Sequence, residues 1–294
     1  MPTVSIRGAH IHYQIHGTGV PVAFTPGGFW GLDDAVPFAE ALSLLGCRVV
    51  IHDRPNCGAS DIVLDDSRTV YDLFADYLHG LLAELRLLPC VIAGASAGAV
   101  TSLAFARRHP ESVRGVVLIS PPTDDPGAWQ AIARSTFQQP ARLAELGGMA
   151  AVAEISLGFF DFPSRIAANP RNRDALLSMD PKRFAAVLRR WGESAASGRE
   201  HVAGLSDAEI AAIAAPALVI CGPDPRNGLH PRHTAERLHE LIAGSRLIVP
   251  YEALPTEVVE KVRAQVAEGG GRLYDAALAP FVRDFALSLG AAPA

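Results

Sequence analysis

Two kinds of hydrophobic pattern recur along the chain. Residues 4–8 and 11–15 alternate apolar and polar positions, which predicts a hairpin of half-buried strands. Short and nearly continuous apolar runs predict strands that are buried on both faces of a parallel sheet. These runs are residues 21–24, 48–52, 90–93, 113–120, 217–221 and 246–249.

Helical spacing of apolar residues separates several of these runs. Residues 70–86 carry leucines and aromatic residues three or four positions apart, which predicts an amphipathic helix. A second helix is predicted over 97–109, where Pro110 ends it, and a last one over 276–289. Strands that alternate with helices indicate a mostly parallel α/β sheet with helices on both faces.

Residues 123–205 interrupt this alternation, because their pattern is helical throughout. We interpret them as a helical lid inserted into a single domain, whose core is formed by residues 1–122 and 206–294. Ser206 and Glu209 have the spacing of a capping box, which predicts the helix that leads back into the core. The insertion is rich in aromatic residues, namely Trp129, Phe159, Phe160, Phe162 and Trp191.

The composition narrows the class of protein. The 294 residues are 49% hydrophobic and carry a net charge of −5 without a basic run, which argues against a nucleic-acid partner. We expect no signal peptide and no membrane span. The four cysteines have neither metal-like nor paired spacing, so we expect reduced thiols and a cytoplasmic protein. The sequence leaves the oligomeric state open.

The strongest chemical signal is Gly94-Ala95-Ser96-Ala97-Gly98, which lies between a predicted strand and a predicted helix. A Gly-x-Ser-x-Gly motif in this setting is typical of a nucleophile elbow, which raises the serine oxygen above the sheet. We expect Ser96 to be a nucleophile. The N–H of Ala97, at the start of the helix, is expected to be one donor of an oxyanion hole.

With these motifs the chain resembles the α/β-hydrolase superfamily over nearly its whole length. "AFTPGGFWG" lies where the family has its first oxyanion loop, and "IHDRPNCGASD" is similar to the family's Asp-x-Arg-Gly-x-Gly-x-Ser loop. "RRHPESVRGVVLISPP" is like the segment after the elbow helix, and "PALVICGPDPRNGLHP" resembles the strand that delivers the catalytic acid. In the second loop Asp53, Arg54, Gly58 and Ser60 match, and Pro55 replaces the usual glycine.

The resemblance implies further site residues. Gly27 or Gly28 would provide the second oxyanion donor, although Thr25 and Pro26 stand where the family usually has His-Gly. The acid would be Asp224, which lies two residues after the glycine at the strand end rather than the usual three. Phe29 and Trp30, which follow the oxyanion loop, are candidates for the substrate pocket.

The general base departs from the family pattern. The superfamily carries its histidine after the last strand, but no histidine occurs beyond position 239. A substitute is therefore required if Ser96 acts through a triad. His230 is the first candidate because it shares a loop with Asp224, and His201 is the second because it lies at the end of the lid. His52, at a strand end, is a weaker candidate.

Further residues are assigned to the pocket or to structural roles. Tyr251 and Glu252 occupy the loop where the usual histidine is missing, and we expect this loop to face the pocket. Trp191 either lines the pocket or packs in the core of the lid. Arg54 is expected to tie its loop to neighbouring segments, and Cys57 to be a small buried residue.

The leading hypothesis is a serine hydrolase that cleaves an ester, lactone or related acyl bond of a small, largely apolar molecule. An alternative is a non-hydrolytic enzyme on the same fold, such as a lyase, a dehydratase or cyclase, or a cofactor-free oxygenase, with an altered triad. A third is a non-catalytic ligand-binding protein. None of the three requires a metal or an organic cofactor.

Overall fold

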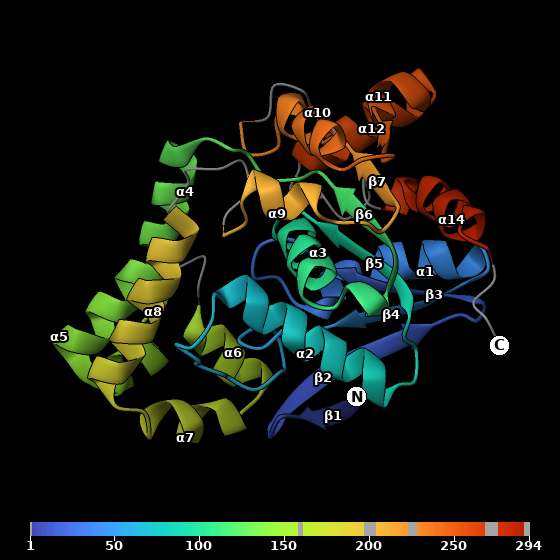
Figure 1. Cartoon of the computed structure of the whole chain (residues 1–294). Helices are drawn as coiled ribbons and strands as arrows, with labels where there is room; N and C mark the ends of the chain where they lie inside the picture. The colour runs from blue at the N-terminus through green and yellow to red at the C-terminus, as the bar shows by residue number, and fades with distance from the viewer. Residues whose placement is uncertain (1, 158–160, 197–203, 223–227, 268–275, 291–294) are drawn as a thin grey trace.

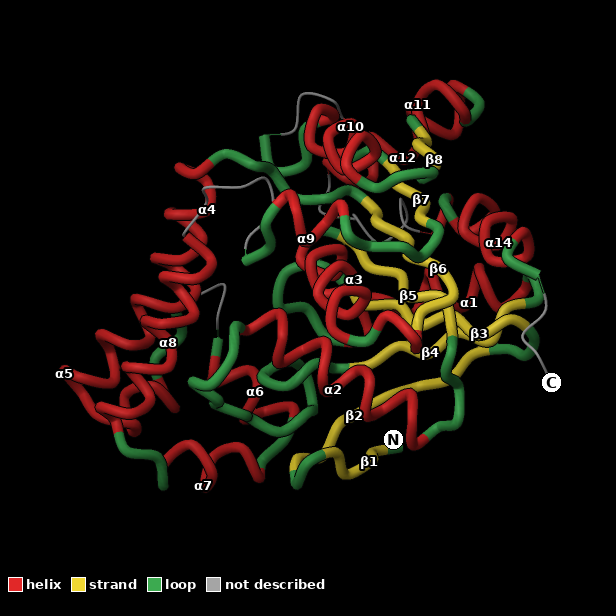
Figure 2. Tube along the Cα trace, viewed as in Figure 1, coloured by secondary structure: helices red, strands yellow, loops and turns green. Residues whose placement is uncertain are grey.

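An eight-stranded, mostly parallel sheet forms the centre of the molecule (Figures 1 and 2). The computed structural model describes residues 2–157, 161–196, 204–222, 228–267 and 276–290. The strand order is β1-β2-β4-β3-β5-β6-β7-β8; β1–β2 and β2–β4 are antiparallel pairs and the remaining pairs are parallel. The strands are β1 (Thr3–Ile6), β2 (Ala9–His16), β3 (Val20–Thr25), β4 (Cys47–His52), β5 (Cys90–Ala95), β6 (Val113–Ile119), β7 (Ala217–Ile220) and β8 (Arg246–Ile248).

The central strands are buried on both faces, as their continuous apolar runs predict. Along β6, Val117 and Ile119 join the core on one side of the sheet, whereas Val116 and Leu118 join the core on the other. This alternation follows from the two-residue period of a strand. The predicted α/β class is therefore confirmed.

Helices cover both faces of the sheet (Figure 2). One face is covered by α1 (Val36–Leu44) and α14 (Ala279–Ser288). The other face is covered by α2 (Val70–Glu84), α3 (Ala97–Arg108), α9 (Asp207–Ala211) and α10 (Arg232–Leu241). Two further helices, α11 (Pro250–Ala253) and α12 (Thr256–Ala267), follow β8.

Between β6 and β7 the chain forms a group of helices that lies beside the sheet, at the left in Figure 1. The group consists of α4 (Pro126–Ala133), a π-helical turn (Arg134–Gln138), α5 (Gln139–Glu154), α6 (Phe162–Ala168), α7 (Arg171–Leu177) and α8 (Pro181–Ala196). The buried Asn172 side chain attaches the group to the loop after β4. Its amide nitrogen donates to the Ser60 carbonyl at 3.1 Å, and its oxygen accepts from the Ile62 N–H at 3.0 Å.

One local prediction, the capping box, is confirmed. Ser206 caps α9, and its capping box with Glu209 is complete in both directions. The four cysteines are all buried. Among the described helices, none has both the length and the apolar character that a membrane crossing requires.

Candidate active site

Ser96 lies at the sharp turn between β5 and α3. Its backbone has φ 51° and ψ −117°, a combination that residues other than glycine rarely adopt. The turn is held from both sides, because the Ser96 N–H donates to the Ile119 carbonyl of β6 at 2.9 Å and the Ala99 N–H donates to the Ser96 carbonyl at 2.9 Å. The side chain is half-buried. This geometry is that of a nucleophile elbow.

Two glycines make the elbow sterically feasible. A Cβ atom on Gly94 would lie 2.1 Å from the carbonyl oxygen of Gly98. A Cβ atom on Gly98 would lie 2.1 Å from the carbonyl oxygen of Thr25, at the end of β3. Both contacts are far below van der Waals distance and involve backbone atoms. The two glycines therefore let β5, α3 and the end of β3 meet closely around Ser96.

The segment after β3 lies against this serine. A Cβ atom built on Gly27 would be 3.1 Å from the Cβ of Ser96 and 3.8 Å from its Oγ, so Gly27 borders the nucleophile directly. Gly28 has φ 50°, in the left-handed region that favours glycine. Ala97 is the first residue of α3, where N–H groups have no partner within the helix. Gly27 and Ala97 thus adjoin Ser96 from two different segments.

His230 reaches Ser96 from the other side of the site. Its Nε2 atom lies 2.8 Å from the Ser96 Oγ, within hydrogen-bond distance. His230 precedes α10 and follows β7, so it arrives from the loop after the seventh strand of the chain rather than after the last strand. The structure thus brings together the two residues that the sequence analysis paired as nucleophile and first candidate base.

Backbone contacts hold this histidine in place. A Cβ atom on Gly222 would lie 2.9 Å from the His230 carbonyl oxygen and 3.1 Å from its Cβ, so the histidine packs against a bare backbone. The preceding residue, Leu229, accepts a hydrogen bond from the Thr123 N–H at 2.7 Å. Nothing in the sequence indicates these contacts, because they join residues from different loops.

The surroundings of His230 favour its neutral form. Burial lowers the pKa of the imidazole from 6.5 to about 4, because the protein replaces the water that would solvate the cation. A neutral ring has one nitrogen with a free lone pair, which accepts a proton. With Nε2 as that nitrogen, the neutral ring presents its lone pair to the Ser96 hydroxyl.

Two other candidates, Asp224 and His201, lie outside the described residues. His52 is described, and it is 2% exposed at the end of β4. Burial lowers its pKa to about 4, with the Arg54 charge as a further cause. The charged groups near His52 are Arg54, Asp53 and His12, whereas among the described histidines His230 is the one hydrogen-bonded to Ser96.

The predicted pocket aromatics lie at different depths. Phe29 packs edge-on against Phe74 of α2 and Phe137 of the helical group, with ring centroids 6.2 and 6.0 Å apart. Trp30 is 51% exposed. Trp191 is 1% exposed and donates its indole N–H to carbonyls of the loop before α2, which places it in the core between this loop and the helical group.

Tyr251 and Glu252 lie on the short helix α11. The Glu252 carboxylate is exposed and pairs with Arg232 at 2.8 Å, and the Tyr251 hydroxyl lies 3.4 Å from the same guanidinium. Their described polar contacts are thus with the start of α10, two residues after His230. They join the last strand's loop to the segment that carries the histidine.

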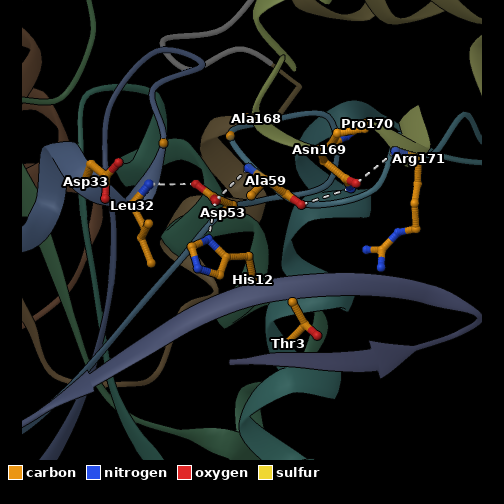
Figure 3. Close-up of a pocket in the computed structure, with 12 residues that line it drawn as sticks. Thr3, His12, Leu32, Asp33, Asp53, Ala59, Ala168, Asn169, Pro170 and Arg171 are labelled. Atoms are coloured by element: carbon orange, nitrogen blue, oxygen red, sulfur yellow. Dashed lines mark hydrogen bonds and ion pairs between the residues drawn. The ribbon is translucent and has the colours of Figure 1, made fainter. Parts of the chain in front are cut away.

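A separate cleft of about 460 Å³ lies between the segment after β3 and the start of α7 (Figure 3). Gly31, Leu32 and Asp33 form one wall, and residues 168–171 form another. At its base the buried His12 and Asp53 are hydrogen-bonded at 2.7 Å. Neither Ser96 nor His230 lines this cleft, so it is distinct from the candidate site.

One group of described side chains has the chemistry of metal ligands. His79, His109 and Glu111 lie where α2 meets the end of α3, with ligand atoms within 4.8 Å of one another. The two imidazoles are stacked, however, with centroids 4.0 Å apart, and their Nε2 atoms face Ser112 and Asp76. Stacked rings do not direct their lone pairs at one point, so the group packs the helices together.

The chain matches the model of the alpha/beta hydrolase family over residues 15–282. Among curated proteins it is similar to YraK, an uncharacterized hydrolase of Bacillus subtilis (strain 168), with 31% identity over 39% of this chain and 42% of the relative. The matched region spans less than half of the length of the curated relatives.

Solved structures resemble the fold over almost its full extent. An esterase from Thermogutta terrifontis superposes with a TM-score of 0.56 and 22% identity, covering 90% of this chain and 96% of the esterase. An enol-lactonase from Burkholderia xenovorans LB400 has a TM-score of 0.56 and 20% identity, covering 90% of this chain and all of that chain. At this identity the likeness concerns the fold.

Proposed function

The chain belongs to the alpha/beta hydrolase family, and from this premise we propose that it is a serine hydrolase acting through Ser96 and His230. The observation that carries the proposal is the 2.8 Å separation between Ser96 Oγ and His230 Nε2. A strained elbow supports it, since a backbone in this conformation costs free energy that a mere binding site does not require. The proposed reaction is hydrolysis of an ester, lactone or related acyl bond.

In the proposed mechanism, Ser96 Oγ attacks the carbonyl carbon while His230 Nε2 accepts the hydroxyl proton. The carbonyl π electrons move to oxygen, and the N–H of Ala97 with that of Gly27 or Gly28 stabilises the resulting oxyanion. The tetrahedral intermediate collapses, and the His230 imidazolium gives its proton to the leaving alkoxide. Water, deprotonated by the same imidazole, then cleaves the acyl-enzyme and restores Ser96.

Asp224 is proposed as the acid that orients the histidine. It lies in the same β7–α10 connection as His230, six residues earlier in the sequence "DPRNGLH". A carboxylate accepting from Nδ1–H would fix the tautomer in which Nε2 is the proton acceptor. It would also stabilise the imidazolium that forms during attack, which burial alone disfavours.

The substrate is proposed to be small and largely apolar. Two large apolar side chains, Trp30 and Leu229, are 51% and 52% exposed, and each belongs to a loop that carries a site residue. Phe29 continues the apolar surface toward the helical group. We propose that this group, α4 to α8, acts as a lid over the substrate, since it is inserted between β6 and β7 and lies beside the sheet.

The test is covalent labelling with a fluorophosphonate probe, followed by mass spectrometry of the labelled peptide. We expect one modified residue, Ser96, with no labelling of the Ser96→Ala variant. Ser102→Ala is the matched control, because its hydroxyl is buried one helical turn away and bonds the Gly98 carbonyl. Labelling elsewhere, or none in the folded wild-type protein, would contradict the proposal.

A second measurement separates hydrolysis from other reactions on this fold. Turnover of p-nitrophenyl butyrate in ¹⁸O-labelled water should place one solvent oxygen in the butyrate. A lyase or dehydratase reaction need not transfer solvent oxygen, and a binding protein would give no product. Loss of turnover in a folded Ser96→Ala variant would assign the reaction to the elbow.

A further inference from the structure

Arg54 is the most buried charged side chain in the described core. It follows β4, its relative exposure is 0%, and its guanidinium lies over the Phe74 ring, 5.2 Å from the centroid. Burying a guanidinium is expensive unless nearby groups compensate for the water that the cation loses. A cation retained at such a place therefore calls for a specific role.

The contacts of Arg54 converge on the oxyanion loop. Its Nη2 atom donates to the carbonyls of Gly27 and Trp30, at 3.4 and 3.3 Å. The Trp30 N–H in turn donates to the Gly27 carbonyl at 3.3 Å, which closes the loop into a turn. The guanidinium thus bonds both ends of the turn that contains the candidate oxyanion donor.

Asp53, the residue before Arg54, holds the same loop at Leu32. Asp53 Oδ1 accepts the Leu32 N–H at 2.6 Å, while Oδ2 accepts from Ala59 and contacts His12. Consecutive residues at the end of β4 therefore fix the loop from Gly27 to Leu32 by its carbonyls and its N–H. In Figure 3 the Asp53 carboxylate and the Leu32 N–H face each other across a drawn bond.

A rigid peptide plane links this clamp to the oxyanion. The Gly27 carbonyl and the Gly28 N–H belong to one trans peptide and point in opposite directions. A side chain that fixes the carbonyl therefore fixes the direction of the N–H. Gly27 itself borders Ser96, so a rotation of this plane changes the donor geometry directly beside the nucleophile.

We propose that Arg54 is a positioning residue for the oxyanion hole, which it serves by holding the Gly27 carbonyl and so aiming the donor of the loop. The inference rests on the proposed serine hydrolase function. The charge of the guanidinium adds to the effect. The guanidinium contacts two carbonyls and a phenyl ring, and its charge also acts on the buried Cys57, Tyr71, His52 and Arg165 side chains. A fixed cation behind the loop polarises its peptides toward a developing negative charge in a low-dielectric site.

The experiment compares Arg54→Met and Arg54→Lys with Arg165→Met. Arg165 is the matched control, because it is also buried and lies over a phenylalanine, 5.4 Å from the Phe162 centroid, but bonds the Asn56 carbonyl instead of the oxyanion loop. Folding is checked by circular dichroism. The readouts are kcat and KM for p-nitrophenyl butyrate, and inhibition by butylboronic acid, which forms a tetrahedral adduct with an active serine.

Arg54→Met is expected to lower kcat by about 10²-fold with KM changed by no more than about threefold, as expected for an interaction made in the transition state. Boronate affinity should fall in parallel. Arg54→Lys keeps the positive charge but loses the planar guanidinium with its several N–H donors, so kcat should fall by at least about tenfold. Arg165→Met should stay within about threefold of wild type.

An unchanged kcat and boronate affinity in a folded Arg54 variant would overturn the inference, and so would an equal loss in Arg165→Met. If Arg54→Met does not fold, the lysine variant decides by the same criterion. Ser96→Ala distinguishes the two proposals. If it retains wild-type turnover, the proposed function fails; if it is inactive while the Arg54 variants keep full activity, only the role of Arg54 fails.

Discussion

The Nε2 atom of His230 lies 2.8 Å from the Oγ atom of Ser96, although 134 residues separate them along the chain. The two side chains approach from the ends of β7 and β5, which lie two strands apart in the sheet with β6 between them. Carboxyl ends of parallel strands share one edge of a sheet, and ligand sites of such folds form there. The role of this contact can be tested by replacing the residues that make it or hold it in place.

Replacement of His230 by alanine should remove the proposed general base. We expect kcat/KM to fall by about 10²- to 10⁴-fold, the usual effect of losing a positioned acid–base group. His233→Ala is the control, since that imidazole belongs to the second residue of α10, is 64% exposed and pairs with Asp124. Steady-state kinetics with p-nitrophenyl butyrate measure both. A loss of only a few-fold in His230→Ala would assign the base elsewhere.

Replacement of Gly222 by alanine should misplace the same histidine without altering any reacting group. The new Cβ would lie 2.9 Å from the His230 carbonyl oxygen, so the backbone of the histidine has to move. Displacement of a catalytic group by about 1 Å can lower the rate by up to about 10²-fold. We expect a fall of at least about tenfold in kcat in a folded protein.

Gly228→Ala is the control for this substitution, because nothing lies within 4 Å of a Cβ atom built there. It adds the same methyl group to the same loop, two residues before His230. Its kcat should match wild type. Equal rates in Gly222→Ala and Gly228→Ala would show that the contact with Gly222 does not position the histidine.

The sequence predicts the strands and the turn around this site better than it predicts the contacts within the site. The apolar runs identify the six strands from β3 to β8, and the alternation of apolar and polar residues identifies the hairpin of β1 and β2. The elbow is recognisable because Gly94 and Gly98 meet backbone at 2.1 Å, a constraint that only glycine satisfies. Local steric requirements of this kind can be recognised from a few adjacent residues in the sequence.

Contacts between loops leave no such local pattern. The absence of a histidine after β8 makes His230 the first candidate base, His201 the second and His52 a weaker one, but a choice among them requires the path of the loops in space. The sequence predicts that Arg54 ties its own loop to neighbouring segments, but it does not identify those segments. The contacts with Gly27 and Trp30 join segments 24 and 27 residues apart, and no spacing rule predicts them.

The rate of hydrolysis should stay high in mildly acidic solution. His230 acts as a base only when it is neutral, and burial lowers its pKa to about 4, so protonation begins well below the ordinary value of 6.5. The acid limb of the kcat/KM profile, which reports ionisation in the free enzyme, should therefore have an apparent pKa clearly below 6.5. An acid limb with an apparent pKa at or above 6.5 would mean that a carboxylate partner raises the pKa of His230 more than burial lowers it.

The stability of the fold should fall over the same range of pH. His52 and His230 both have a pKa of about 4 in the folded protein, against 6.5 as the ordinary value. Between these values the unfolded chain binds more protons than the folded one, so the free energy of unfolding decreases as the pH falls from about 6.5 to about 4. Each histidine contributes about 3 kcal/mol to this loss by its shift.

Urea denaturation at a series of pH values measures this dependence, and His52→Leu isolates one of the two groups. His52 lies apart from the Ser96–His230 pair, and both of its ring nitrogens are buried without a hydrogen-bond partner among the described residues. A leucine of similar size loses no hydrogen bond there and cannot be protonated. We expect the variant to lose less stability than wild type between pH 6.5 and pH 4, with the difference approaching about 3 kcal/mol. Parallel curves for the two proteins would show that His52 is not held neutral by the fold.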